Sequence, residues 1–170
     1  MTSSPSESPS PSPAPASDPA PIELELVARA TITLAQPLEA GPALLGVRRV
    51  IGITGGRFEG PSFGADILPG GADWQTVAPD GTAVIDTRYS ARTDAGHVLE
   101  IATQGFRHGA PEVLARIAAG EPVGADEYYF RLTASLSTAD PALEWVNRTV
   151  FVASATRAQA DVVYDLFAVR

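Results

Sequence analysis

An acid and an indole follow two glycines in the segment LPGGADWQ, residues 68–75. The carboxyl group of Asp73 can act as a general acid or base if a dry pocket raises its pKa toward the working pH. The indole of Trp74 can stack on an aromatic ligand. The same segment is equally typical of a tight loop between two strands, because Pro and Gly readily adopt turn conformations.

Strand geometry bears on whether Asp73 and Trp74 can act together. Pro69, Gly70 and Gly71 predict the turn that leads into a strand beginning near Asp73. Successive side chains of a regular strand point to opposite faces, so Asp73 and Trp74 cannot both face a cavity. Either a bulge after Gly71 reorients one of them, or only one is functional. Of the two, we favour Asp73.

Segment 82–92 alternates between a charged face, which includes Arg88, and a mainly apolar face, which includes Tyr89. One interpretation places Arg88 in water and Tyr89 in the core. The other uses the fact that small barrels which hold a ligand line their interior with a few polar groups. Arg88 would then bind an anionic or carbonyl oxygen through its rigid fork of donors.

The segment DEYYFRL, residues 126–132, offers the same choice. Tyr128 begins an apolar stripe that continues with every second residue, and this leaves Tyr129 and Arg131 on the opposite face. Core packing and a ligand pocket both explain such a stripe.

A further strand is predicted over 146–154, where Trp145 and Asn147 would share a face. An asparagine on a buried face needs a hydrogen-bond partner, because an unpaired buried amide costs about 1 to 3 kcal/mol. That partner is either a backbone group at a strand end or a ligand.

Strand-like alternation also predicts the elements that must position these residues. From Ile22 to Leu34 every even position is apolar, which predicts a long strand with one buried face. Rougher alternation recurs in later segments, with turn signals between them: 47–54, 64–68, 73–78, 82–92, 97–106, 127–137, 146–154 and 161–169. One short helix is predicted after His108, with Pro111 in its first turn and Gly120 as its stop.

The fold class expected from these elements is all-β and mainly antiparallel. We predict a single β-barrel of about 8–10 strands with one short helix and a central cavity, because closing the sheet removes exposed edges. Residues 1–20 are rich in Ser, Pro and Ala and predict a disordered tail. Residues 21–170 then form the single barrel domain.

Composition excludes several classes of function. The 170-residue chain has a net charge of −8, and its twelve cationic side chains are scattered arginines, so nucleic acid is not an expected partner. No apolar run is long enough for a membrane span, which predicts no membrane partner. The lack of cysteine and of a secretory signal fits a cytoplasmic location.

Common catalytic and cofactor motifs are missing. The glycine-rich segment GITGGRFEG, residues 52–60, lacks the lysine and the helix of a phosphate-binding loop and predicts a strand with a bulge. His97 and His108 are the only histidines, and a metal site would need both to converge with a carboxylate. We therefore expect neither a metal nor a cofactor.

Six segments, in this order, resemble the domain-of-unknown-function family 3237, also called uncharacterised protein family 0311. They are ITGGRFEGP, LPGGADWQ, DTRYSARTDAG, RHGAPEVLARIAAGEPV, EYYFRLTASLSTADPALEWVNRTVFVA and VVYDLF. The resemblance runs from about residue 22 to the C-terminus. It implies an antiparallel β-barrel with a central cavity, often a homodimer. Some relatives sit in natural-product pathways and are thought to close oxygen-containing rings in polyketide-like substrates.

The matched segments imply a set of site residues. Asp73 and Arg88 would be catalytic, and the substrate-binding residues would be Trp74, Tyr89, Tyr128, Tyr129, Arg131, Trp145 and Asn147. The first functional hypothesis is a cofactor-free cyclase or isomerase for a polyketide-like or aromatic molecule. Asp73 would transfer protons, and Arg88 or Arg131 would stabilise oxyanion charge. The alternatives are a non-catalytic carrier of a small hydrophobic molecule, or a purely structural role for the polar residues, without a ligand-sized cavity.

Overall fold

A computed structural model describes residues 18–158 and 161–170. Most of the tail predicted over 1–20 lies outside the described residues. The sheet contains ten strands, which are, in chain order, β1 (Leu24–Leu34), β2 (Leu38–Ala43), β3 (Gly46–Glu59), β4 (Ala65–Ile67), β5 (Ala72–Val77), β6 (Ala83–Thr93), β7 (Val98–Gly109), β8 (Tyr128–Thr138), β9 (Phe151–Ala158) and β10 (Asp161–Val169).

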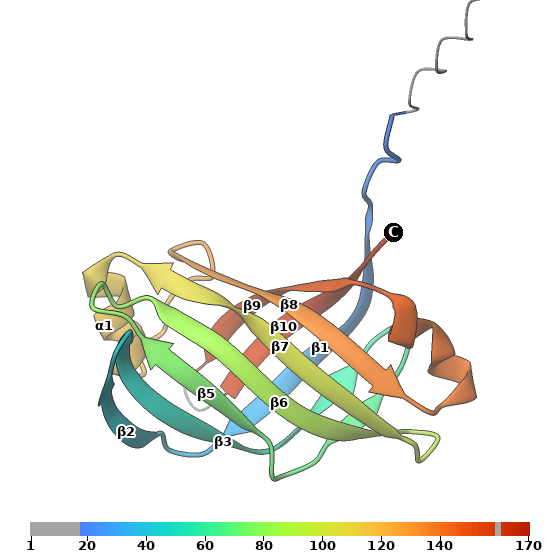
Figure 1. Ribbon diagram of the computed structural model, residues 1–170, viewed down its shortest axis with the longest axis horizontal. Helices are drawn as coiled ribbons and strands as arrows, with labels where there is room; N and C mark the ends of the chain where they lie inside the picture. The colour runs from blue at the N-terminus through green and yellow to red at the C-terminus, as the bar shows by residue number, and fades with distance from the viewer. Residues whose placement is uncertain (1–17, 159–160) are drawn as a thin grey trace, which may run out of the picture.

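The sheet closes into an antiparallel barrel (Figure 1). Neighbouring strands follow the order β1, β10, β9, β8, β7, β6, and the long strand β3 closes the circle by pairing with β1. The short strands β4 and β5 both lie between β3 and β6 and fill one position together. The wall therefore has eight strand positions, and β2 extends it as a hairpin with β3. This confirms the predicted all-β barrel.

Strand β1 corrects the prediction of one continuous buried face from Ile22 to Leu34. Its pairing with β10 shifts register between Leu26 and Ala28, so the inward-facing set changes from one parity to the other. Val27 and Ala28 are both fully buried, whereas Leu24 and Leu26 are exposed. Downstream of this bulge the predicted even-numbered residues face inward.

The glycine-rich segment 52–60 lies almost wholly within β3, as predicted. The pairing of β1 with β3 shifts register where Thr33 pairs with Gly55 and Leu34 with Ile53. Gly56 has a φ of +134°, and a side chain there would overlap with the carbonyl of Thr31. The glycines thus allow two strands to approach closely at the bulge, and the segment serves to close the barrel.

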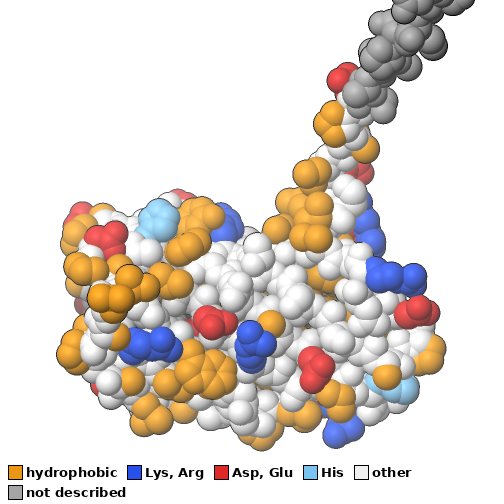
Figure 2. Space-filling view, in the orientation of Figure 1, with side chains coloured by type: hydrophobic (Ala, Val, Ile, Leu, Met, Phe, Trp, Pro, Cys, Tyr) orange, Lys and Arg blue, Asp and Glu red, His pale blue; other side chains and the backbone are white. Residues whose placement is uncertain are grey.

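The predicted helix is present as α1 (Pro111–Ala118). Pro111 lies in its first turn, and Gly120, with a φ of +74°, follows its C-terminal end. The helix caps one end of the barrel, and hydrophobic side chains gather around this end (Figure 2). Among the described residues, no helix is long and apolar enough to cross a membrane.

The strand predicted over 146–154 begins later than expected. Residues Pro141–Arg148 instead form a 3₁₀ helix, η1, and β9 begins at Phe151. The side chain of Asp140 caps η1 by accepting a hydrogen bond from the backbone N–H of Ala142 at 3.0 Å. The alternation assumed for Trp145 and Asn147 therefore does not apply.

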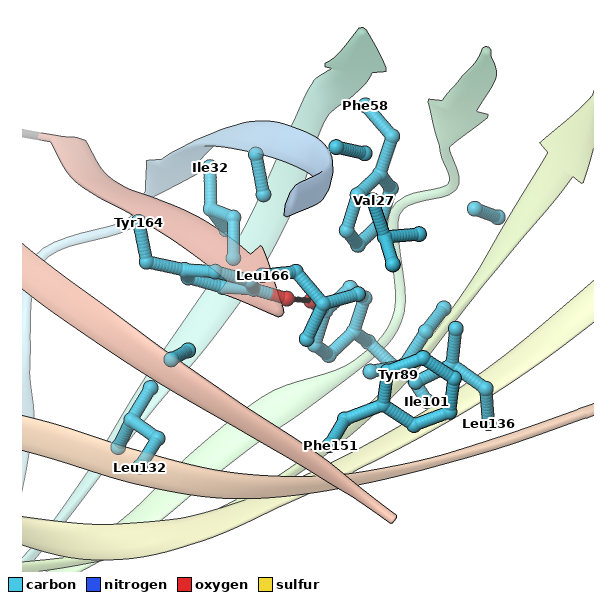
Figure 3. Packing of buried hydrophobic residues seen from close by; sticks show 14 of the residues in the cluster. Val27, Ile32, Phe58, Tyr89, Ile101, Leu132, Leu136, Phe151, Tyr164 and Leu166 are labelled. Atoms are coloured by element: carbon cyan, nitrogen blue, oxygen red, sulfur yellow. Dashed lines mark hydrogen bonds between the residues drawn. The ribbon is translucent and has the colours of Figure 1, made fainter. Parts of the chain in front are cut away.

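Large buried side chains pack against one another in part of the barrel interior (Figure 3). Phe58 lies against Tyr89 and Tyr164, with ring centroids 6.3 and 6.1 Å apart. The hydroxyl groups of Tyr89 and Tyr164 form a hydrogen bond with each other. Phe58, Tyr89 and Tyr164 thus form a packed aromatic floor. The interior between this floor and α1 is open.

Candidate functional site

A cavity of about 510 Å³ occupies the barrel interior between this floor and α1. Tyr164 lines its lower end, and residues 117–120 and 34–37 line its mouth. Its apolar wall comes from strands on several sides of the barrel, with Ile32, Ile51, Ile85 and Leu132 among its members. Pockets for drug-sized ligands begin at about 300 Å³. The cavity therefore counts against the reading that expected no ligand-sized space.

Asp73 lies in the cavity wall, near the start of β5. Its side chain is buried, as is that of Gln75, whereas Trp74 between them is 40% exposed. The strand is regular at this point, and the predicted opposition of Asp73 and Trp74 is confirmed. Gly71 makes the approach possible, because a Cβ atom there would overlap with Tyr89.

A short polar chain holds the Asp73 carboxylate. Oδ2 accepts a hydrogen bond from Gln75 Nε2, and Oδ1 accepts one from the backbone N–H of Asp86 at 3.2 Å. Gln75 Oε1 in turn accepts a hydrogen bond from Arg49 Nε at 2.9 Å. Because Arg49 can only donate, it fixes the orientation of the Gln75 amide. The amide N–H₂ group is therefore directed at the carboxylate.

Burial raises the pKa of Asp73 above its ordinary value, because the charged form loses its hydration. The hydrogen bonds from Gln75, Asp86 and Thr87 and the positive charge of Arg49 oppose this rise without cancelling it. A raised pKa brings the protonated and ionised forms of a carboxyl group closer in free energy at physiological pH, which favours proton transfer to and from a bound molecule. This property, in a cavity, makes Asp73 the candidate acid or base.

Three arginines also line the cavity: Arg49 on β3, Arg107 on β7 and Arg157 on β9. Burial lowers the pKa of Arg107 to about 10, and the positive charges of Arg49 and Arg157 add to the effect. Burial and the charge of Arg49 likewise lower the pKa of Arg157. Gln36, Gln75, Thr87 and Thr103 are the uncharged polar side chains of the wall.

These arginines were not among the residues predicted from the sequence. Their odd-numbered strand positions nevertheless indicate the inward face. Arg49 has the same parity as Ile51 and Ile53, and Arg107 the same parity as Leu99 and Ile101. Those apolar residues are buried, so the arginines continue inward-facing rows. An arginine at the end of an apolar row is the pattern that could have identified them.

The predicted residues of β6 lie elsewhere. Arg88 is exposed on the outer face of the barrel. Tyr89 is buried in the aromatic floor, where it packs against Phe58 and bonds to Tyr164. The charged face in water and the tyrosine in the core are thus what the structure shows for this strand.

The predicted residues of β8 lie on two opposite faces of the strand. Tyr129 and Arg131 lie on the outside, where Tyr129 stacks on His108 with ring centroids 4.8 Å apart. Tyr128 is buried, and its hydroxyl accepts a hydrogen bond from the backbone N–H of Arg157 at 2.7 Å. Tyr128 therefore positions the backbone of a cavity arginine without lining the cavity itself.

Trp145 and Asn147 belong to η1, at the opposite end from α1. The Asn147 side chain accepts from the backbone N–H of Thr138 at 2.9 Å and donates to its carbonyl at 3.0 Å. Of its two predicted partners, a strand-end backbone group is the one present. Trp145 packs against Phe151 and Arg170. Of the nine predicted site residues, all within the described ranges, Asp73 alone lines the cavity.

Fold and site together define a small closed β-barrel with an internal cavity that has both an apolar and a charged wall. The sequence profile of the family described as "Protein of unknown function (DUF3237)" matches residues 22–169, so the chain belongs to this family. A UPF0311 protein from Rhodopseudomonas palustris is 35% identical over 136 residues, which are 80% of this chain and 89% of that protein. A UPF0311 protein from Clostridium acetobutylicum is 33% identical over 138 residues, which are 81% of this chain and 87% of that protein.

Solved structures share the fold. A β-barrel-like protein from Acinetobacter baumannii has 43% sequence identity and a TM-score of 0.79, covering 90% of this chain and 99% of its own. A conserved protein of unknown function from Rhodopseudomonas palustris has 33% identity and a TM-score of 0.86, covering 89% and 100%. An enzyme from Penicillium herquei has 16% identity and a TM-score of 0.68, covering 91% and 99%. At that identity the likeness concerns the fold alone.

Proposed function

We propose that the protein is a cofactor-independent cyclase or isomerase that acts on a polyketide-like or aromatic metabolite by general acid/base catalysis. The observation that carries the proposal is Asp73, a buried carboxyl group with a raised pKa in the wall of a ligand-sized cavity. Its neighbours hold one orientation of the carboxylate, which is what proton transfer to a bound molecule requires.

In this mechanism Asp73 removes a proton from a carbon or hydroxyl group of the substrate and returns it at another atom. An enolate or alkoxide oxygen develops charge in the step, and the cavity arginines stabilise that charge. The apolar wall around Ile51 and Leu132 keeps water away from the reacting atoms. In this proposal Arg49 and Arg107 take the role that was expected for Arg88 or Arg131.

The fold is compatible with such a role. The Penicillium herquei structure, which shares the barrel, is that of an enzyme. A non-catalytic carrier of a hydrophobic metabolite is the second candidate, because the apolar wall alone suits such a ligand. The two candidates differ in whether Asp73 moves a proton.

An exchange assay tests the proposal without the natural substrate. Benzoylacetone, an aromatic 1,3-diketone, is incubated with the protein in deuterated buffer, and loss of its acidic C–H signal is followed by NMR. We expect the wild-type protein to accelerate the exchange and Asp73→Asn to be at least tenfold slower, since general catalysis contributes about 10² to 10⁴ in rate. Asp66→Asn, at an exposed position of β4 outside the cavity, is the matched control.

The outcomes separate the two functions. Exchange that is equally fast in the Asp73→Asn variant removes Asp73 from the mechanism. Binding of benzoylacetone to the wild-type protein without any acceleration favours the carrier. Retention of the same affinity in the slow Asp73→Asn variant supports a catalytic rather than a binding role for the carboxyl group.

A further inference from the structure

The charges inside the cavity are unbalanced. Arg49, Arg107 and Arg157 bring three guanidinium groups to its wall, from three different strands. Among the described lining residues, Asp73 is the one acidic side chain. Even with this carboxyl group ionised, the polar part of the cavity keeps an excess of positive charge.

Burial lowers the pKa values of Arg107 and Arg157, and repulsion from the neighbouring guanidinium groups lowers them further. Arginine nevertheless stays protonated at neutral pH. The free protein thus holds a repulsive cluster of like charges in a partly enclosed space.

One donor of this cluster has no protein partner. Within the described part of the chain, Arg107 Nε is a buried side-chain nitrogen without a hydrogen-bond acceptor. A buried unpaired donor is costly, and the cost is greater for a charged group. By contrast, Arg49 Nε is bonded to Gln75 Oε1 at 2.9 Å. Arg107 therefore lines the cavity with a guanidinium group whose Nε has no protein acceptor, and a ligand oxygen in the cavity would supply that group with an acceptor.

The geometry points to an organic anion as the ligand of this cavity: an apolar body against Ile32, Ile51 and Leu132, and an anionic oxygen group bound by Arg107 with Arg49 and Arg157. The anionic group is a carboxylate or an ionised phenol or enol, because both present the oxygens that an arginine fork binds. This inference rests on the proposed function insofar as the cavity must take up a small molecule. It specifies the substrate class of that site.

Because the whole chain is negatively charged, a preference for anionic ligands must come from the cavity itself. The protein carries a net charge of −8, so its surface repels small anions in general. Uptake of an anion by an acidic protein therefore requires a local positive site. The arginine cluster is such a site, and its apolar surroundings strengthen each charged hydrogen bond.

Matched naphthalene probes test the inference by isothermal titration calorimetry. The probes are 2-naphthoate, the neutral 2-naphthamide and 2-naphthol, the last titrated at pH 7 and at pH 9. We expect 2-naphthoate to bind the wild-type protein at least tenfold more tightly than 2-naphthamide if the group is a carboxylate. An affinity for 2-naphthol that rises at least tenfold from pH 7 to pH 9 assigns an ionised phenol or enol instead.

Arginine variants locate the effect. In Arg107→Met the preference for the anion should fall below twofold, while 2-naphthamide still binds, because the apolar wall is unchanged. Arg157→Met provides an independent reduction if the first variant does not fold, and circular dichroism reports folding of both. Arg88→Met, on the outer face, is the matched control and should keep the full preference.

Three results would overturn the inference. They are equal affinity for 2-naphthoate and 2-naphthamide together with no rise in 2-naphthol affinity at pH 9, no binding of any probe, and an anion preference that survives in folded Arg107→Met and Arg157→Met. The proposed function is tested separately by proton exchange on benzoylacetone, a neutral diketone. An Asp73-dependent exchange with no anion preference would reject the anionic ligand and retain the enzyme.

Discussion

At the scale of single residues, Asp73 combines a chemical role with an energetic cost. Its carboxyl group is buried and accepts hydrogen bonds from Gln75 and from the backbone of Asp86. Those donors stabilise the charged form, yet burial prevails and the pKa is raised. Folding therefore favours the protonated form of this residue, which links the stability of the barrel to pH.

This linkage predicts a pH-dependent difference between the wild-type protein and Asp73→Asn. A raised pKa in the folded state means that the contribution of Asp73 is fully present below its ordinary pKa of 3.8. It is lost as the pH rises through the raised value. Urea unfolding from pH 3.5 to pH 7 should show the wild-type protein losing stability relative to the variant, and a constant difference would contradict the prediction.

Asp165 supplies a comparison of opposite sign. The hydrogen bonds from Arg29, at 2.7 and 2.8 Å, lower its pKa. Its contribution should therefore be present above pH 3.8 and lost as the pH falls through the lowered value. The difference between the wild-type protein and Asp165→Asn should shrink in acid, whereas the difference for Asp73→Asn shifts the other way.

The tyrosine pair in the floor is suited to a double-mutant cycle. Tyr89 and Tyr164 are buried, and their hydroxyl groups bond to each other. Tyr89→Phe alone leaves the Tyr164 hydroxyl without this partner, at a cost of about 1 to 3 kcal/mol. The double variant Tyr89→Phe/Tyr164→Phe removes both groups and should lie close to wild type in the free energy of unfolding. Additive losses in the two single variants would exclude the coupling.

At the scale of elements, the turn before β5 decides where Asp73 lies. Gly71 packs its backbone against β6: a Cβ atom there would overlap with Tyr89 Cβ and lie 2.7 Å from the carbonyl oxygen of Arg88. Both are parts of the wall and cannot move independently of it. The glycine therefore lets β5 start close enough to β6 for Asp73 to reach the cavity.

We expect Gly71→Ala to lower the thermal midpoint and to weaken any activity that depends on Asp73, because β5 must shift. Gly52→Ala is the matched control in the neighbouring strand, where the new Cβ would lie 3.6 Å from Ala35 Cβ, an ordinary contact. It should be neutral or slightly stabilising, since alanine loses less conformational entropy than glycine on folding. Equal thermal midpoints for both variants, measured by circular dichroism, would show that the close approach is not needed.

Elements were more predictable than the site for a physical reason. Alternation within one strand placed Asp73 opposite Trp74 and put Tyr128 inside, because side-chain parity is a local property. Local breaks defeat it: the bulge at Val27 turns Leu24 outward, and η1 replaces the expected start of a strand at residue 146. The arginine cluster depends on the register of strands β3, β7 and β9 around a closed barrel, which no single segment encodes.

At the scale of the whole molecule, the barrel divides into two halves with different tasks. Phe58, Tyr89 and Tyr164 close one half with packed side chains that stabilise the fold. The other half remains open and concentrates ionisable groups whose burial opposes folding. A solid floor allows the open half to be tolerated, because most of the apolar burial lies outside the cavity.

The outer wall bears on the homodimer expected from the family resemblance, which stays a prediction. Exposed apolar side chains, among them Phe106 at 52% and Tyr129 at 45%, surround a hollow that also contains Asp86 and Arg131. This face carries one acidic and one basic side chain, so a twofold axis would pair Asp86 of one copy with Arg131 of the other. We expect sedimentation velocity to show a dimer that Phe106→Glu dissociates, whereas Leu44→Glu, at a fully exposed hairpin position, leaves it intact. A wild-type protein that sediments as a monomer at micromolar concentration would refute the prediction, and a dimer unaffected by Phe106→Glu would place the interface on another face.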